Sequence, residues 1–139
     1  MCIRDSNLIL PGKNYGWPVV GYGVNYRTGL PIHKSVERSG MEQPIVHWVP
    51  SIGASGLMIY DGDAFPMWKG SIFAGGLAAT HRRLSRLSLD GTRVMTRETL
   101  LLDRLRIRDI RQGPEGYIYL AVDDRGGELT EIVRMEPSE

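Results

Sequence analysis

The feature that most constrains the fold is the steady alternation of short apolar runs and turn signals between residues 45 and 135. The runs are about six residues long, the usual length of a strand, and the clearest of them, residues 117–122, is closed by a turn signal that begins at Asp123. Residues 84–89 nearly alternate in polarity and end at Asp90-Gly91, a strong hairpin signal. No segment keeps an apolar period of 3.6 residues. The pattern therefore predicts an all-β, antiparallel meander of the kind found in sandwiches, barrels and propeller blades.

Residues 7–43 have a different character from the rest of the chain. They are rich in Gly, Pro, Tyr and Asn and show little periodicity. A loop of this length is usually functional or disordered. Its aromatic residues, among them Tyr15, Trp17 and Tyr22, favour an ordered functional loop ahead of Ile45.

Composition excludes several classes of protein. The 139 residues amount to about one domain. With 42% hydrophobic residues and a net charge of +1, the chain is neither a disordered charged tail nor a typical nucleic-acid binder. The longest uncharged stretch, residues 43–60, contains two prolines and two glycines and therefore predicts no membrane-spanning helix. A single cysteine, Cys2, excludes an internal disulfide and a cysteine metal cluster.

Residues 1–6 lack the apolar core of a signal peptide and join awkwardly to the segment that begins at Asn7. We expect them to be a non-native leader, so that the domain covers residues 7–139 and belongs to a longer parent protein.

Three motifs together resemble the glucose/sorbosone dehydrogenase family of soluble quinoproteins. They are Pro-Gly-Lys-Asn-Tyr-Gly-Trp-Pro at 11–18, Trp-Val-Pro-Ser-Ile-Gly-Ala-Ser-Gly at 48–56 and Arg-Ile-Arg-Asp-Ile-Arg-Gln-Gly-Pro-Glu-Gly at 106–116. Their order and spacing are kept over roughly residues 7–137. The resemblance implies the C-terminal part of a six-bladed β-propeller, with about two four-stranded antiparallel blades and a long loop.

The resemblance also implies an activity for the parent protein. Family members bind pyrroloquinoline quinone (PQQ) and calcium, oxidise the C1 hydroxyl of an aldose to a lactone and pass the electrons to an acceptor. The general-base histidine and the segment that holds the catalytic calcium are implied to lie outside this chain, so no catalytic residue is assigned here. We expect a periplasmic or secreted enzyme with an aldose and an electron acceptor as partners.

Arg106 and Arg108 are the strongest candidates for the cofactor site. They are two residues apart on a short predicted strand, so their side chains project to the same side. Guanidinium groups match carboxylate and quinone oxygens and stay charged. The resemblance assigns both to PQQ, whereas the residues alone also allow the solvated face of an edge strand. Asp109 could orient one arginine, but we favour a role in bracing the blade.

The other site candidates come from the resemblance. Trp48 is implied to lie near the mouth of the cofactor site, where its ring would cover the quinone or the sugar; packing within a blade explains it equally well. The backbone carbonyl of Tyr15 is implied to hold a structural calcium, with an acidic side chain that falls within the leader. Ala78 stands where several members have a lysine that contacts the quinone, so Arg82 or His81 could take over that contact.

Alternative interpretations of the same residues remain open. The three histidines, His33, His47 and His81, have no metal-ligand spacing and are predicted to be structural. A non-catalytic, secreted β-propeller that binds other molecules is the main alternative to an enzyme, because one fold hosts many functions. A lectin-like module is a third possibility. The arginine pair discriminates between them, since a pure scaffold has no need of it.

Overall fold

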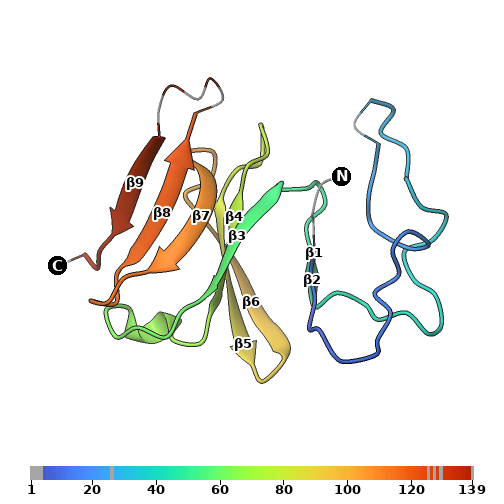
Figure 1. Cartoon of the computed structure of the whole chain (residues 1–139), viewed down its shortest axis with the longest axis horizontal. Coiled ribbons are helices and arrows are strands. Elements are labelled where there is room, and N and C mark those ends of the chain that lie inside the picture. Colours follow the sequence, from blue (N-terminus) through green and yellow to red (C-terminus); the bar gives the residue numbers. More distant parts are fainter. Residues whose placement is uncertain (1–4, 26, 125, 127, 129, 139) are drawn as a thin grey trace.

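The structure is a computed structural model that describes residues 5–25, 27–124, 126, 128 and 130–138. Within these residues, nine strands form three antiparallel sheets (Figure 1). The predicted all-β, antiparallel fold is confirmed, since the only helix among the described residues is the short 3-10 turn η1 (Pro66–Trp68). No described helix is long and apolar enough to cross a membrane.

Two of the three sheets are successive meanders. The first has the order β3-β4-β5-β6 and comprises β3 (Ala54–Ile59), β4 (Ile72–Gly76), β5 (Leu84–Asp90) and β6 (Arg93–Leu100). The second has the order β7-β8-β9 and comprises β7 (Arg106–Gln112), β8 (Ile118–Asp123) and β9 (Thr130–Met135). The predicted hairpin at Asp90-Gly91 joins β5 to β6, with Asp90 opposite Arg93 and Gly91 at a positive φ of 58°. The second sheet has three strands within the described residues, so it corresponds to a partial blade beside the complete four-stranded one, in agreement with the expected two blades.

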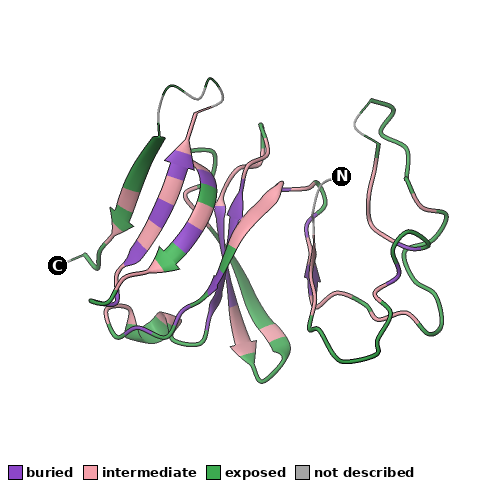
Figure 2. Cartoon of the chain, in the orientation of Figure 1, coloured by how far each residue is buried: buried purple, intermediate pink, exposed green. Residues whose placement is uncertain are grey.

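The main core lies between these two sheets. Its buried side chains come from both, including Phe73 of β4, Leu84 of β5, Ile107 and Ile110 of β7, and Leu120 of β8. A second cluster, which includes Trp48, Ile52 and Leu87, packs against the first sheet as well. All five residues of β4 are buried, whereas burial alternates along β8 (Figure 2). The first sheet is therefore covered on both faces along β4, whereas the second sheet packs mainly through one face.

Small residues allow β7 to lie close to the first sheet. A Cβ added to Gly75 would lie 2.8 Å from Cγ2 of Ile107, and one added to Gly56 would lie 2.7 Å from Cα of Asp109. The Ser55 hydroxyl donates a hydrogen bond to the carbonyl of Ile107 at 2.5 Å. These contacts fix the strand that begins with Arg106 against the first sheet.

Tyr60 ties the two sheets together at the other end of β3. Its ring is fully buried, and its hydroxyl donates to the Gly116 carbonyl (2.7 Å) and accepts from the Phe65 N–H (3.0 Å). Gly116 lies in the turn between β7 and β8, at a positive φ of 86°. The hydroxyl therefore holds this turn, and with it the β7–β8 hairpin, on the first sheet.

We expect Tyr60→Phe to lower the free energy of unfolding of the full-length protein by about 1–3 kcal/mol, because it leaves a buried carbonyl and a partly buried N–H without their partner. Equilibrium unfolding in urea measures this change. Tyr117→Phe is the control, and its effect should stay within about 0.5 kcal/mol. Equal effects of the two variants would show that the Tyr60 hydroxyl does not hold the turn.

The segment before β3 forms a loop lobe, residues 7–45, beside the blades (Figure 1). It is held by local hydrogen bonds and by isolated bridges between Val20 and Ser35 and between Val24 and Pro31. The third sheet joins the lobe to the blades by pairing β1 (Asp5–Ser6) with β2 (Val46–His47). The sequence pattern assigns Asp5 and Ser6 to the leader, whereas the structure places both in this sheet; residues 1–4 lie outside the described residues.

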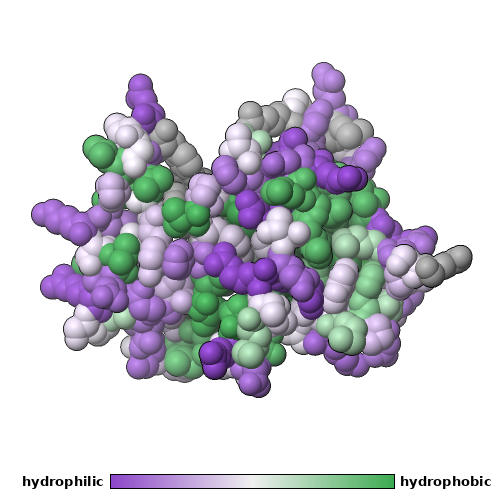
Figure 3. Space-filling model, turned by 180° about the vertical axis from the view of Figure 1, so that it is seen from behind, coloured by the Kyte–Doolittle hydropathy of each residue, from purple (hydrophilic) through white to green (hydrophobic). Residues whose placement is uncertain are grey.

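Apolar side chains remain exposed on the loop lobe and on the blades. Trp17, Leu30 and Ile32 are more than half exposed on the lobe, as are Ile59 on β3 and Ile132 on β9. The rear face in Figure 3 shows apolar side chains over both parts of the molecule.

Candidate functional site

The two predicted cofactor arginines lie together at the start of β7. A bulge between Ile107 and Asp109 interrupts the pairing of β7 with β8, and Arg106 stands opposite Asp123, the last residue of β8. Arg106 donates from Nη1 to both carboxylate oxygens of Asp123, at 2.5 and 2.6 Å. Arg108 donates from Nε to Oδ2 of the same carboxylate at 2.7 Å. The two guanidinium groups therefore share one carboxylate, on the same side of the strand, as their spacing predicts.

Burial and charge distinguish the members of this arginine–aspartate cluster, which we define as Arg106, Arg108 and Asp123. The side chains of Arg106 and Asp123 are 18% and 13% exposed, whereas that of Arg108 is 51% exposed. The hydrogen bond from Arg106, assisted by the one from Arg108, lowers the pKa of the Asp123 carboxyl below its ordinary value. The carboxylate is thus ionised at neutral pH, and the cluster carries a net charge of +1.

One polar atom of the cluster has no partner. Nε of Arg106 is buried and makes no hydrogen bond among the described residues. A buried donor in this state is costly, which is typical of functional sites rather than of simple structural ion pairs. The residues therefore fit an anionic, planar group such as PQQ, which carries three carboxylates: one guanidinium is fixed inside and one is half-exposed.

Asp109 does not belong to the cluster. Its carboxylate accepts a hydrogen bond from its neighbour's backbone, the Ile110 N–H (2.9 Å), and pairs with Arg111 (2.9 Å). It also contacts β3 closely at Gly56. This agrees with the bracing role that we favoured.

Sequence reasoning missed Asp123, the residue that in fact orients both arginines. The sequence pattern places it only in the turn that closes the strand. The available signal was the hairpin register: the short turn after Gln112 aligns the end of β8 with the start of β7, and an acidic residue there faces a basic one.

Trp48 is a packing residue in this structure. Its side chain is 4% exposed and belongs to the cluster with Val46, Ile52 and Ile72. The guanidinium of Arg97 lies over the indole, 5.8 Å from the ring centre. Since side chains of this chain cover the ring, the contact with a quinone or sugar stays a prediction.

Tyr15 uses its phenol to close a loop. The hydroxyl donates to the Leu8 carbonyl and accepts from the Leu10 N–H, both at 2.7 Å. Calcium requires six or more oxygen ligands. Among the described residues, no group of three or more His, Cys, Asp and Glu residues gathers in a way that could hold a metal. Calcium binding through the Tyr15 carbonyl therefore stays a prediction.

The segment around Ala78 is engaged in local structure. The Ala78 N–H donates to the Ile52 carbonyl (2.8 Å), and Arg82 donates from Nε to the Asp103 carbonyl (3.0 Å). His81 hydrogen-bonds through Nδ1 with the hydroxyl of Thr80. A contact of Arg82 or His81 with a quinone stays a prediction.

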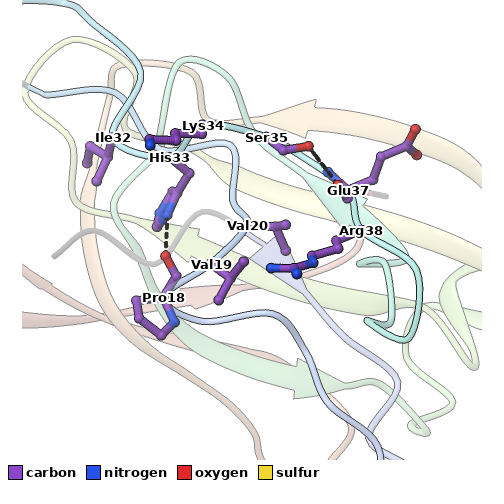
Figure 4. Close-up of a pocket in the computed structure, with 9 residues that line it drawn as sticks. All are labelled: Pro18, Val19, Val20, Ile32, His33, Lys34, Ser35, Glu37 and Arg38. Atoms are coloured by element: carbon purple, nitrogen blue, oxygen red, sulfur yellow. Dashed lines mark hydrogen bonds between the residues drawn. The ribbon is translucent and has the colours of Figure 1, made fainter.

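The other two histidines contact residues of the loop lobe. His47 stacks on Tyr22, with ring centres 3.9 Å apart, and His33 hydrogen-bonds through Nδ1 to the Pro18 carbonyl at 2.8 Å. His33 is one wall of an open cavity of about 490 Å³ in the lobe (Figure 4). Its other lining residues are Pro18, Val19, Val20, Ile32, Lys34, Ser35, Glu37 and Arg38. None of the cluster residues lines this cavity, so the two features are separate.

Two consecutive antiparallel meanders that pack face to face are consistent with neighbouring blades of a β-propeller. The sequence profile described as Glucose / Sorbosone dehydrogenase matches residues 5–131. The chain therefore belongs to the glucose/sorbosone dehydrogenase family, as the three motifs predict.

Relatives support the same assignment. The chain is 38% identical over 130 residues to the aldose sugar dehydrogenase YliI of Escherichia coli, covering 92% of this chain and 34% of the relative. A crystal structure of a glucose dehydrogenase matches with a TM-score of 0.83 and 44% identity, covering 97% of this chain and 39% of the other. The PQQ-bound aldose sugar dehydrogenase of Streptomyces coelicolor matches with a TM-score of 0.62 and 25% identity, covering 96% and 37%. The chain thus spans about a third of the length of the curated relatives it matches.

Proposed function

We propose that this chain supplies part of the PQQ site of a sugar dehydrogenase, and that the full-length protein oxidises the C1 hydroxyl of an aldose to a lactone. The observation that carries the proposal is the arginine–aspartate cluster, with two guanidinium groups on one side of β7 and a net charge of +1. The PQQ-bound relative supports the choice of cofactor. An aldose and an electron acceptor are the proposed partners, calcium is a proposed second cofactor, and the proposed location is periplasmic or extracellular.

The chain's own residues would act by binding and by electrostatics. When bound, PQQ would supply the group that accepts two electrons from the sugar. Arg108 would bind a carboxylate from the exposed side, because guanidinium donors match carboxylate geometry. Arg106, fixed and mostly buried, would place positive charge where negative charge builds up during the reaction, and preorganised charge of this kind lowers the barrier.

The test is reduction of a dye by the purified full-length protein with PQQ, calcium and an aldose. We expect turnover that depends on PQQ. We expect no turnover from the isolated 139-residue chain, because the general base is proposed to lie elsewhere and is commonly worth about 10² to 10⁴ in rate. Turnover by the isolated chain would place the missing base within it, and a full-length protein that neither binds PQQ nor reduces the dye would refute the proposal.

A non-catalytic binding propeller is the second candidate. It is favoured by the fact that Asp123 already neutralises one of the two arginines, and by Ala78, which has no charged group. The same assay separates the two candidates, because a scaffold would show neither PQQ binding nor turnover.

A further inference from the structure

We propose that Asp123 is the positioning residue of the PQQ site: it holds the two guanidinium groups side by side and sets which of their nitrogens remain for the cofactor. This inference rests on the proposed function and adds a residue to which neither the motifs nor the predicted strand pattern assigns a role.

The need for such a residue follows from charge. Two guanidinium cations that share one side of a strand repel each other, and the repulsion grows where water is partly excluded. Arg106 is mostly buried, so the site could not keep both cations together without an anion. Asp123 is also mostly buried and touches both cations, whereas the other nearby acid, Asp109, pairs with Arg111. Asp123 therefore compensates one charge and leaves the other for an anionic ligand.

Direction matters as much as charge. Asp123 accepts hydrogen bonds from Nη1 of Arg106 through both of its oxygens and from Nε of Arg108 through Oδ2. Within the described residues, no hydrogen bond engages the two terminal nitrogens of Arg108, whose side chain is half-exposed. The pair of terminal nitrogens is the edge of a guanidinium that can grip a carboxylate with two parallel bonds. By holding Nε, Asp123 sets the direction of that edge.

The position of Asp123 is itself fixed by the fold. Asp123 ends β8 opposite Arg106, and Arg108, which lies at the bulge between Ile107 and Asp109, reaches the same carboxylate. Bulges often redirect a side chain next to a functional site. Without Asp123, the two arginines would have no common carboxylate to fix their positions.

The experiment compares Asp123→Asn, Asp123→Glu and the control Asp109→Asn in the full-length protein. PQQ affinity is measured by direct titration, and folding is checked by the melting temperature. Asn keeps the shape but turns an N–H donor toward the arginine donors, so the guanidinium groups lose their common acceptor. We expect PQQ affinity to fall about tenfold even though the loss of the carboxylate charge alone would favour an anionic ligand. Glu keeps the charge but displaces the carboxylate by one methylene. We therefore expect Asp123→Glu to lower PQQ affinity about threefold. If Asp123 acted through its charge alone, this variant would bind PQQ with the wild-type affinity. Asp109→Asn should bind PQQ like the wild type.

A double variant separates positioning from general bracing. If Asp123 acts through Arg108, adding Asp123→Asn to Arg108→Ala should cost much less affinity than it does in the wild type. Wild-type PQQ affinity in both Asp123 variants, or a lower melting temperature with unchanged affinity, would overturn the positioning role and leave the proposed function standing. If Asp123→Asn does not fold, the Asp123→Glu titration decides alone. A wild-type protein that binds no PQQ would overturn the proposed function and this inference together.

Discussion

Replacing Arg106 with alanine in the full-length protein is expected to weaken PQQ binding by about 10- to 150-fold. The variant removes a charge-assisted contact, which is worth roughly 1.5–3 kcal/mol, and frees Asp123 to add an uncompensated negative charge to the site. Arg108→Ala should lose affinity in the same range, since the half-exposed guanidinium is the one proposed to meet a cofactor carboxylate. Titration with PQQ and steady-state turnover of an aldose measure both effects.

Matched variants test whether the loss comes from the cofactor contact. Arg106→Lys should recover part of the affinity, because lysine restores the charge but not the planar fork. Arg111→Ala is the control: Arg111 lies on the same strand, is exposed and pairs with Asp109 outside the cluster. If Arg106→Ala and Arg108→Ala lower the melting temperature but leave PQQ affinity and turnover intact, the arginines brace the blade and the scaffold interpretation is correct.

Local patterns in the sequence predicted the strands well, because strand ends are set by short-range chemistry. The Asp90-Gly91 turn, the strand at 117–122 and the absence of helical periodicity correspond to β5–β6, β8 and an all-β fold. The two arginines could be paired in advance, since residues two apart on a strand share a side. These features depend on neighbours in sequence alone.

Long-range contacts were the part that the local sequence patterns did not predict. Asp123 is 15 residues from Arg108, and only the hairpin register and the bulge bring them together. The burial of Trp48 depends on side chains from β4 and β5, which are distant in the sequence. The role of Asp109 also depends on a long-range contact. Whether it orients an arginine or braces the blade is decided by its contact with Gly56 on β3, which is set by how the two sheets pack.

That packing leads to the second large effect, at Gly56. A Cβ at this position would lie 2.6 Å from Oδ1 of Asp109, 2.7 Å from its Cα and 2.8 Å from the Ile110 nitrogen. Two of these atoms belong to the backbone, so side-chain rotation cannot relieve the overlap and β7 must move away from β3. We expect Gly56→Ala to lower the free energy of unfolding by about 3 kcal/mol, at the upper end of the usual cost of overpacking.

The same displacement should reach the cofactor site. β7 carries Arg106 and Arg108, and the Ser55–Ile107 hydrogen bond next to Gly56 holds it at the level of the arginines. Gly56→Ala is therefore expected to weaken PQQ binding as well as stability, although Gly56 contributes no side chain to the site. Gly126→Ala is the matched control, because the nearest atom to an added Cβ there is 3.7 Å away, an ordinary contact. Urea unfolding and PQQ titration of both variants measure the two effects. Wild-type stability in Gly56→Ala would contradict the close approach of the two sheets, and lost stability with full PQQ affinity would show that the position of β7 against β3 does not control the arginine pair.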